Sequence, residues 1–167
     1  MTARAIILMG VSGSGKTTIG ELLSQALGWP FYDADDFHPP ANVDRMRQGI
    51  ALTDEDRQPW LAALARLIGD ALSADQSLVL ACSALKTAYR ERLTPRGATG
   101  GEVRFVYLRV PVDVAAARLR NRSGHYMPAS LVPSQFATLE EPADATVIDA
   151  TQSPEAIVAD IRRRLSL

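Results

Sequence analysis

Short apolar runs alternate with segments of helical periodicity along most of this chain. Residues 5–9, 30–33, 78–82, 105–108 and 146–148 have the length and the apolar character of buried strands. Strands that alternate with helices pair in parallel through right-handed crossovers, with helices on both faces of the sheet. The pattern therefore predicts an α/β fold of three layers, α/β/α, around a five-stranded parallel sheet.

Residues that start and stop helices flank the periodic segments. Gly28 can end the first helix in a left-handed conformation, Pro111 can begin a later one, and Ser153 can cap the last. Residues 53–57 have the character of a helix entrance. The apolar residues that we expect to share one buried face of a helix are Ile19, Leu22, Leu23, Ala26 and Leu27; Leu61, Leu64, Ile68 and Leu72; and Ile157, Val158, Ile161 and Leu165. The helix that Pro111 begins carries Val112, Ala115, Ala116 and Leu119.

The size and charge of the chain narrow the classes of protein to which it can belong. Because 47% of its 167 residues are hydrophobic, residues 1–167 are expected to form a single domain. The net charge of −1 argues against a nucleic-acid or anionic-membrane partner, and no apolar run reaches the roughly 18 residues of a membrane span. Cys82 has no second cysteine to pair with, and the N-terminus lacks a signal-peptide pattern. We therefore expect a cytoplasmic protein.

The sequence Gly10-x-x-x-x-Gly15-Lys16-Thr17, between the first strand and the first helix, is the P-loop pattern. Its glycines let backbone N–H groups face phosphates, and the helix N-terminus adds its dipole. Lys16 is expected to bridge the β- and γ-phosphates of ATP, and Thr17 to hold Mg²⁺ through its hydroxyl. The residues that we expect to bind the nucleotide are Gly10, Val11, Ser12, Gly13, Ser14, Gly15, Lys16, Thr17 and Thr18.

A P-loop indicates a nucleoside triphosphate but not its use. The candidate classes are a small-molecule kinase, a GTPase-type switch and an ATP-driven motor or assembly factor. A switch needs an Asn-Lys-x-Asp segment, and neither Lys16 nor Lys86, the two lysines of the chain, follows an asparagine. A motor usually has an acidic residue at the end of an apolar strand, whereas the run 78–82 is followed by Ser83. These observations favour the kinase class.

The acidic segment FYDADDFH, residues 31–38, contains the end of the second predicted strand. Ligands bind beyond the carboxyl ends of the strands in open α/β sheets, so Asp33 and Asp35 are expected at the binding edge. We predict that Asp33 helps to hold Mg²⁺ and that Asp35 orients the acceptor hydroxyl for phosphoryl transfer. An acidic loop exposed to solvent is the alternative. His38 is either an acceptor ligand or a hydrogen-bonding loop residue.

Five segments, taken in order, resemble those of the gluconokinase family of small P-loop kinases. They are LMGVSGSGKTT, FYDADDFHP, LTDEDRQPWL, LACSALKTAYRERL and RSGHYMPASLVPSQFATLEEP, and the resemblance extends from about residue 6 to residue 148. It implies ATP-dependent phosphorylation of D-gluconate at O6, the fold of shikimate and adenylate kinases, and a homodimer. A kinase of another small anionic acceptor, such as shikimate or another sugar acid, is the alternative. A non-catalytic ATP-binding regulator is a further one.

The resemblance also implies an acceptor-binding insertion, at about 36–75, that closes over gluconate. A carboxylate on a polyhydroxyl chain requires a cation and several hydrogen-bonding groups. Arg57 and Arg90 are the candidates for the carboxylate, with Lys86 on the same helical face as Arg90. Each of the three could instead be a solvated surface charge. Ser83 either caps the helix after the third strand or lines the acceptor pocket.

An arginine-rich segment followed by a proline-broken one, at about 120–141, is expected to form a mobile lid. Arg118 and Arg122 align with lid arginines of the family and are predicted to bring positive charge over the transferring phosphoryl group. Cationic residues also favour helix C-termini, so a structural role is the alternative for both. His125 and Gln135 are further candidates for contact with gluconate.

Overall fold

A parallel sheet of five strands forms the centre of the structure, a computed structural model in which residues 4–121 and 128–167 are described. The strands lie in the order β2-β3-β1-β4-β5, so β1 is central and pairs with β3 and β4. They are β1 (Ala5–Met9), β2 (Phe31–Asp33), β3 (Leu78–Ala81), β4 (Val103–Arg109) and β5 (Thr146–Asp149). The five-stranded parallel sheet predicted from the sequence is confirmed.

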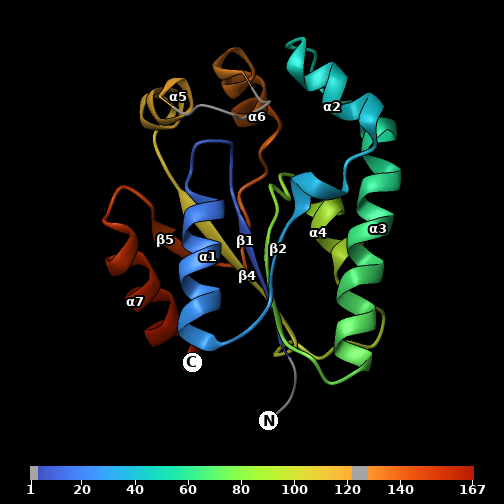
Figure 1. Ribbon diagram of the computed structural model, residues 1–167, viewed down its shortest axis with the longest axis vertical. Helices are drawn as coiled ribbons and strands as arrows, with labels where there is room; N and C mark the ends of the chain where they lie inside the picture. Colours follow the sequence, from blue (N-terminus) through green and yellow to red (C-terminus); the bar gives the residue numbers. More distant parts are fainter. Residues whose placement is uncertain (1–3, 122–127) are drawn as a thin grey trace.

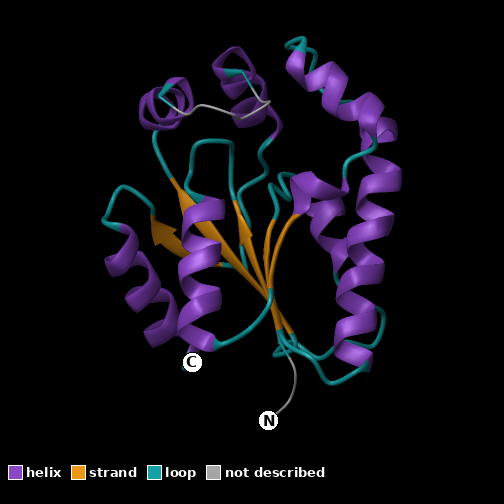
Figure 2. Ribbon diagram, viewed as in Figure 1, coloured by secondary structure: helices purple, strands orange, loops and turns teal. Residues whose placement is uncertain are grey.

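Helices cover both faces of this sheet, as Figures 1 and 2 show. The helices α1 and α7 pack on one face, and α3 and α4 pack on the other. The helices are α1 (Lys16–Leu27), α2 (Pro40–Arg47), α3 (Asp54–Ser73), α4 (Thr87–Leu93), α5 (Val112–Arg120), α6 (Val132–Thr138) and α7 (Pro154–Leu165), with short 3₁₀ helices η1 (Ala34–Phe37) and η2 (Ala129–Leu131). The architecture is therefore the three-layer α/β/α fold that the sequence predicts.

The central strand β1 contributes to both halves of the core. Ile6 and Leu8 belong to the cluster beneath α1 and α7, whereas Ile7 and Met9 belong to the cluster that contains Trp60 of α3. Successive side chains of a strand point to opposite faces of its sheet, so an uninterrupted apolar run is what a strand covered on both faces requires. The strand β1 is therefore packed against side chains on both faces of the sheet.

Three of the predicted helix boundaries are also borne out. Gly28 ends α1 in a left-handed conformation with φ of 69°, and the Ser153 side chain accepts a hydrogen bond from the Ala156 N–H at the start of α7. Thr53 and Asp56 form a reciprocal capping box at the start of α3. Local capping chemistry therefore marks these three boundaries in the sequence.

Two helices were not predicted from the sequence. In α2, the buried residues are Asn42 and Met46, which do not make an apolar stripe. In α6, the run Val132–Thr138 begins with a proline in its first turn and spans only two turns. Hydrophobic periodicity is recognisable only over a longer amphipathic segment, so it does not predict either helix.

Within the described residues, no helix is long and apolar enough to cross a membrane.

The strand order brings three chain segments together at one edge of the sheet. Asp33 of β2 and Leu8 of β1 both pair with Ala81 of β3, which lies between them. The loop after β1, the segment after β2 and the turn after β3 therefore leave the sheet side by side. In Figure 1 the helices α2, α5 and α6 stand above this edge.

Candidate active site

The loop from Gly10 to Gly15 joins β1 to α1 in a conformation that depends on its glycines. Gly13 has φ of 85°, and a Cβ atom added there would lie 2.3 Å from the carbonyl oxygen of Ala115 in α5. Gly15, with φ of 99°, occupies the N-cap position of α1. Residues with side chains rarely adopt such angles, so the loop can turn directly into the helix N-terminus only with glycine at these positions. This is the geometry of a phosphate-binding loop.

Lys16 lies at the start of α1 with its ammonium group directed back over the loop. Its Nζ donates hydrogen bonds of 2.9 Å to the carbonyl oxygens of Gly10 and of Val11. The positive charge is thereby held at the phosphate-binding loop. An ammonium in this position can compensate the charge that accumulates on a bound triphosphate.

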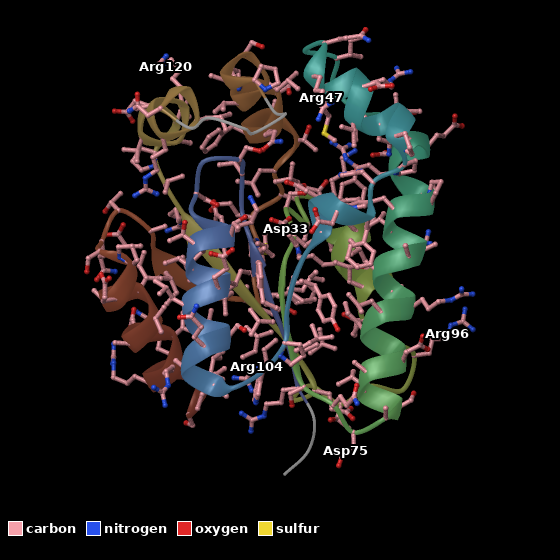
Figure 3. All side chains as sticks on the ribbon, in the orientation of Figure 1. Asp33, Arg47, Asp75, Arg96, Arg104 and Arg120 are labelled. Carbon is pink, nitrogen blue, oxygen red and sulfur yellow. The ribbon has the colours of Figure 1, made fainter. Side chains whose placement is uncertain are left out.

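A single pocket, called the central pocket below, brings most of the predicted site residues together. The lining residues come from the P-loop, from residues 33–60, from the end of β3 and the turn after it, and from η2 and α6. Its lining residues are Ser12, Gly13, Gly15, Lys16, Thr17, Asp33, Asp35, His38, Met46, Ala51, Leu52, Arg57, Trp60, Ala81, Ser83, Leu85, Leu131, Ser134 and Gln135. Asp33, labelled in Figure 3, lies in the middle of the molecule between α1 and α3.

The carboxylate of Asp33 is oriented by two hydrogen bonds. The Thr17 hydroxyl donates to Oδ2 over 2.8 Å, and the backbone N–H of Asp35 donates to Oδ1 over 3.0 Å. Asp33 thereby caps η1 and links β2 to the start of α1. Hydroxyl and carboxylate oxygens are the ligands that Mg²⁺ prefers, and this ion often takes only one or two protein ligands beside phosphates and water. The hydroxyl of Thr17 and the carboxylate of Asp33 fit that mode of binding.

His38 lines the central pocket as a neutral imidazole. Its ring stacks on the indole of Trp60, with centroids 4.3 Å apart and an interplanar angle of 10°. Burial, together with the nearby positive charge of Arg57, lowers the pKa of His38 from 6.5 to about 4. The side-chain amide of Asn42 lies 3.4 Å from Nδ1 of His38. Sequence reasoning identified His38 but missed Trp60 and Asn42, because stacking partners leave no signal in spacing.

Arg57 reaches the central pocket from the first turns of α3. Its Nη1 donates to the carbonyl oxygen of Leu52 over 2.9 Å and to the hydroxyl of Tyr89 over 3.0 Å. Within the described part of the chain, no hydrogen bond engages Nε or Nη2 of Arg57. The guanidinium is thus anchored through one nitrogen, and the other two can receive an anionic ligand.

Lys86 and Arg90 do not line the central pocket, which corrects the expected location of both. Lys86 is the N-cap residue of α4, and its ammonium forms an ion pair with Asp54 at 2.9 Å. Arg90 is buried and donates hydrogen bonds to the carbonyl oxygens of Ala84, at 2.7 Å, and of Glu140, at 2.9 Å. Arg90 therefore supports the turn after β3 and the segment after α6.

Ser83 lines the central pocket but caps no helix. The helix α4 begins at Thr87, so the turn from Cys82 to Lys86 separates it from β3. The carbonyl oxygen of Ser83 accepts a 3.2 Å hydrogen bond from the N–H of Gly10. Of the two expectations for Ser83, the structure supports the pocket and contradicts the cap.

Arg118 lies on the opposite side of the P-loop from the central pocket. Its Nη1 is 3.4 Å from the carbonyl oxygen of Gly13 and 3.3 Å from that of Ser14, and its Nη2 donates to Ala150 over 2.8 Å. It lines a second pocket between α1, α5 and the loop that follows β5. The other lining residues are Gly13, Ser14, Gly15, Thr18, Ile19, Asn121, Ala150, Gln152, Pro154 and Ile157. Sequence reasoning missed this second pocket, because the segment after β5 carries no motif.

Gln135 connects α6 to the P-loop. Its Oε1 accepts a 2.7 Å hydrogen bond from the backbone N–H of Ser12, and its side chain lines the central pocket. The helix α6 is thus in direct contact with the phosphate-binding loop. Two further predicted site residues, Arg122 and His125, lie outside the described residues.

Taken together, a P-loop at the end of the central strand and acidic residues from a nearby strand in the same pocket define a P-loop kinase. Comparison with known proteins agrees. The family model described as shikimate kinase matches residues 12–166. Gluconokinase from Gluconobacter oxydans (strain 621H) is 44% identical over 163 residues, which cover 96% of this chain and 90% of that protein. The Arabidopsis thaliana gluconokinase is 44% identical over 173 residues, covering 96% and 92% respectively.

Solved structures give the same assignment. A gluconokinase from Sinorhizobium meliloti 1021 superposes with a TM-score of 0.84 at 40% identity, covering 99% of this chain and 93% of that one. Shikimate kinase from Aquifex aeolicus, with a TM-score of 0.64 at 20% identity and coverage of 97% and 96%, shares the fold. The chain is therefore an enzyme of the P-loop kinase class. More narrowly, it belongs to the gluconokinase family.

Proposed function

We propose that this enzyme transfers the γ-phosphoryl group of ATP to O6 of D-gluconate and releases 6-phospho-D-gluconate and ADP. The observation that carries the proposal is the composition of the central pocket. One pocket holds the P-loop lysine Lys16, the carboxylate of Asp35 and the guanidinium of Arg57. Gluconate combines a carboxylate with a terminal hydroxyl, and these side chains match the two ends of such a molecule. Relatives named gluconokinase at 44% identity support the same acceptor.

Acceptor binding is assigned to side chains of the insertion and of the lid. Arg57 receives the carboxylate through Nε and Nη2, the nitrogens that its own anchoring leaves available. His38, neutral and held against Trp60, exchanges hydrogen bonds with hydroxyl groups of the acceptor. Ser83 and Gln135 line the same pocket and supply further polar contacts. Lys86 and Arg90 are engaged elsewhere and take no part in this assignment.

Phosphoryl transfer is assigned to Lys16 and Asp35. Asp35 orients the O6 hydroxyl and accepts its proton as the bond from O6 to the γ-phosphorus forms and the bond from that phosphorus to ADP breaks. Lys16 compensates the negative charge on the β- and γ-phosphates. The nucleotide is assigned to the P-loop residues 10–18. Arg118, in α5, and Arg122, in the proposed lid at about 120–141, are proposed to add positive charge at the phosphates.

Mg²⁺ is proposed to accompany ATP, held by Thr17 and Asp33. Their oxygens already lie 2.8 Å apart and come from two elements that the sheet fixes in place. When bound, the ion neutralises charge on the phosphates. Residues 1–167 are proposed to act as one kinase domain, with the insertion at about 36–75. We also propose that the enzyme is cytoplasmic and that it forms a homodimer. Light scattering, which measures the mass in solution, tests the homodimer.

An ADP-release assay with a panel of acceptors tests the proposed reaction. The panel contains gluconate, shikimate, ribose, AMP and adenylylsulfate, each with ATP and Mg²⁺. We expect gluconate alone to give fast turnover. Shikimate is included because the shikimate kinase family model matches most of the chain. If shikimate or any other member of the panel gave faster turnover than gluconate, that compound would become the assigned acceptor.

A further inference from the structure

Behind the central pocket, three side chains form a continuous chain of contacts that ends at Arg57. Lys86 Nζ donates to both carboxylate oxygens of Asp54, at 2.9 and 3.1 Å. The Tyr89 hydroxyl donates to Oδ1 of Asp54 and accepts a 3.0 Å hydrogen bond from Nη1 of Arg57. Of these four side chains, only Arg57 lines the central pocket.

The protonation states fix the direction of each hydrogen bond in this chain. Hydrogen bonds from Tyr89 and then from Lys86 lower the pKa of Asp54, so its carboxylate is ionised and only accepts. Burial raises the pKa of Tyr89, so its hydroxyl keeps the proton that it donates to Asp54. The lone pairs of that oxygen consequently face Arg57. The Tyr89 oxygen therefore accepts a hydrogen bond from the Arg57 guanidinium and has no proton left to donate to it.

Tyr89 is rigidly placed for this task. Its side chain is 3% exposed and packs in the same core cluster as Trp60 and Leu61 of α3. The guanidinium of Arg57 also lies over the Tyr89 ring, with Cζ 5.4 Å from the centroid. An arginine side chain has many rotamers, and freezing it before ligand binding removes an entropic cost that binding would otherwise carry.

We propose that Tyr89 is a positioning residue that presents Nε and Nη2 of Arg57 to the carboxylate of the acceptor, with Asp54 and Lys86 fixing the Tyr89 hydroxyl. The inference rests on the proposed function, because it takes Arg57 as the carboxylate ligand. Both hydrogens of Nη1 are used, one on Tyr89 and one on Leu52. The free edge of the guanidinium is therefore the one that can form two parallel hydrogen bonds to a carboxylate.

The test compares kcat/KM for gluconate with the KM for ATP in the Tyr89→Phe variant of the full chain. Loss of the hydrogen bond that orients Arg57, without loss of the arginine itself, is expected to lower kcat/KM for gluconate about three- to tenfold through KM, with the KM for ATP unchanged. Tyr107→Phe is the matched control, because Tyr107 is equally buried at 3% exposure in the same core cluster and its hydroxyl contacts Glu141 instead. This control is expected to leave both constants unchanged.

A second pair of variants avoids disturbing the core. Asp54 is exposed at the first turn of α3, and Asp54→Ala removes the acceptor of the Tyr89 proton. Glu55→Ala removes an exposed charge from the same turn without touching Tyr89 and controls for the helix dipole. We expect the KM for gluconate to rise in Asp54→Ala and not in Glu55→Ala. Asp54→Asn, which keeps an acceptor oxygen, is expected to restore most of the loss.

An Arg57→Ala background shows whether Tyr89 acts through Arg57. In that background, Tyr89→Phe is expected to have no further effect on kcat/KM for gluconate. Full additivity of the two substitutions, or equal losses toward gluconate and ATP, would overturn the positioning role. If the unmodified enzyme showed no gluconate-dependent release of ADP, the proposed function would fail and this inference would fail with it. Normal activity with an unaltered KM in Tyr89→Phe would overturn the positioning role alone.

Discussion

The Thr17 hydroxyl donates a 2.8 Å hydrogen bond to Oδ2 of Asp33, joining the first turn of α1 to the end of β2. One partner belongs to the P-loop and the other to the acidic segment 31–38, yet the sheet order places both at one edge. Both residues line the central pocket, and in the proposed function they are the ligands of Mg²⁺. The geometry of this pair leads directly to a prediction about metal dependence.

Asp33→Asn is expected to raise the Mg²⁺ concentration required for half-maximal activity by about tenfold or more, because an amide oxygen is a weaker ligand for a hard cation than a carboxylate. Titration of initial rates with Mg²⁺ at saturating ATP and gluconate measures the effect. Asp36→Asn serves as the control, since Asp36 is exposed and is not a lining residue of the pocket. An unchanged Mg²⁺ requirement in Asp33→Asn would remove Asp33 from the metal site.

Lys16→Ala and Asp35→Asn are each expected to lower kcat by about 100-fold or more, because each removes a charged group that positions or stabilises the reacting atoms. The two defects should differ in kind. Lys16→Ala should weaken the stabilisation of phosphate charge, whereas Asp35→Asn should leave ATP binding intact. Single-turnover measurements with preformed enzyme–ATP complexes separate the two. Near-normal turnover in Asp35→Asn would show that another group orients the acceptor hydroxyl.

Arg57→Ala is expected to raise the KM for gluconate far more than the KM for ATP, because Arg57 lies at the start of α3, outside the P-loop, and is the proposed ligand of the gluconate carboxylate. Steady-state kinetics with each substrate varied in turn provide both constants. Equal increases in the two values would contradict a role in carboxylate binding. Testing an acceptor that lacks the carboxylate adds a second check, since its poor turnover should be insensitive to Arg57→Ala.

The low pKa of His38 has a consequence for stability. Between pH 6.5 and about pH 4, an unfolded chain protonates this histidine while the folded chain keeps it neutral, so the unfolded state binds more protons. The free energy of unfolding is therefore expected to fall as pH decreases through this window. Urea unfolding at pH 7 and pH 4.5 should show a smaller loss in His38→Gln than in the unmodified enzyme. Parallel losses in the two proteins would contradict a buried, neutral His38.

The sequence predicted the sheet and the P-loop well because both depend on local patterns. An apolar run such as 5–9 must be a strand buried on both faces, and the glycines at 10, 13 and 15 must form a tight loop before the helix. The location of Asp33 in the central pocket could be predicted because Asp33 is the last residue of β2. These features need no knowledge of the rest of the chain.

Lys86 and Arg90 were misplaced for a reason that is visible in the backbone. A cap at Ser83, one of the two alternatives for that residue, would start the helix directly after β3, whereas Ala84 adopts a left-handed conformation with φ of 44° and α4 begins only at Thr87. Alanine rarely takes this conformation, so nothing in the sequence signalled the turn. The carbonyl of Ala84 is satisfied by Arg90, which explains why this arginine is buried.

Other parts of the site depend on contacts between residues that are far apart in the sequence. His38 is neutral because burial beside Trp60 and the charge of Arg57, both in α3, disfavour its protonated form. Tyr89 reaches Arg57 across 32 positions of the chain. Such relationships are set by how α3 and α4 pack, and a single sequence contains no periodic signal for them.

The most direct test of the proposed reaction is a crystal structure of the enzyme with gluconate and a non-hydrolysable ATP analogue. We predict that O6 of gluconate lies within hydrogen-bond distance of the Asp35 carboxylate and in line with the γ-phosphorus, with the gluconate carboxylate on Arg57. A gluconate molecule bound in the opposite orientation, or bound with O6 out of reach of the γ-phosphorus, would contradict it.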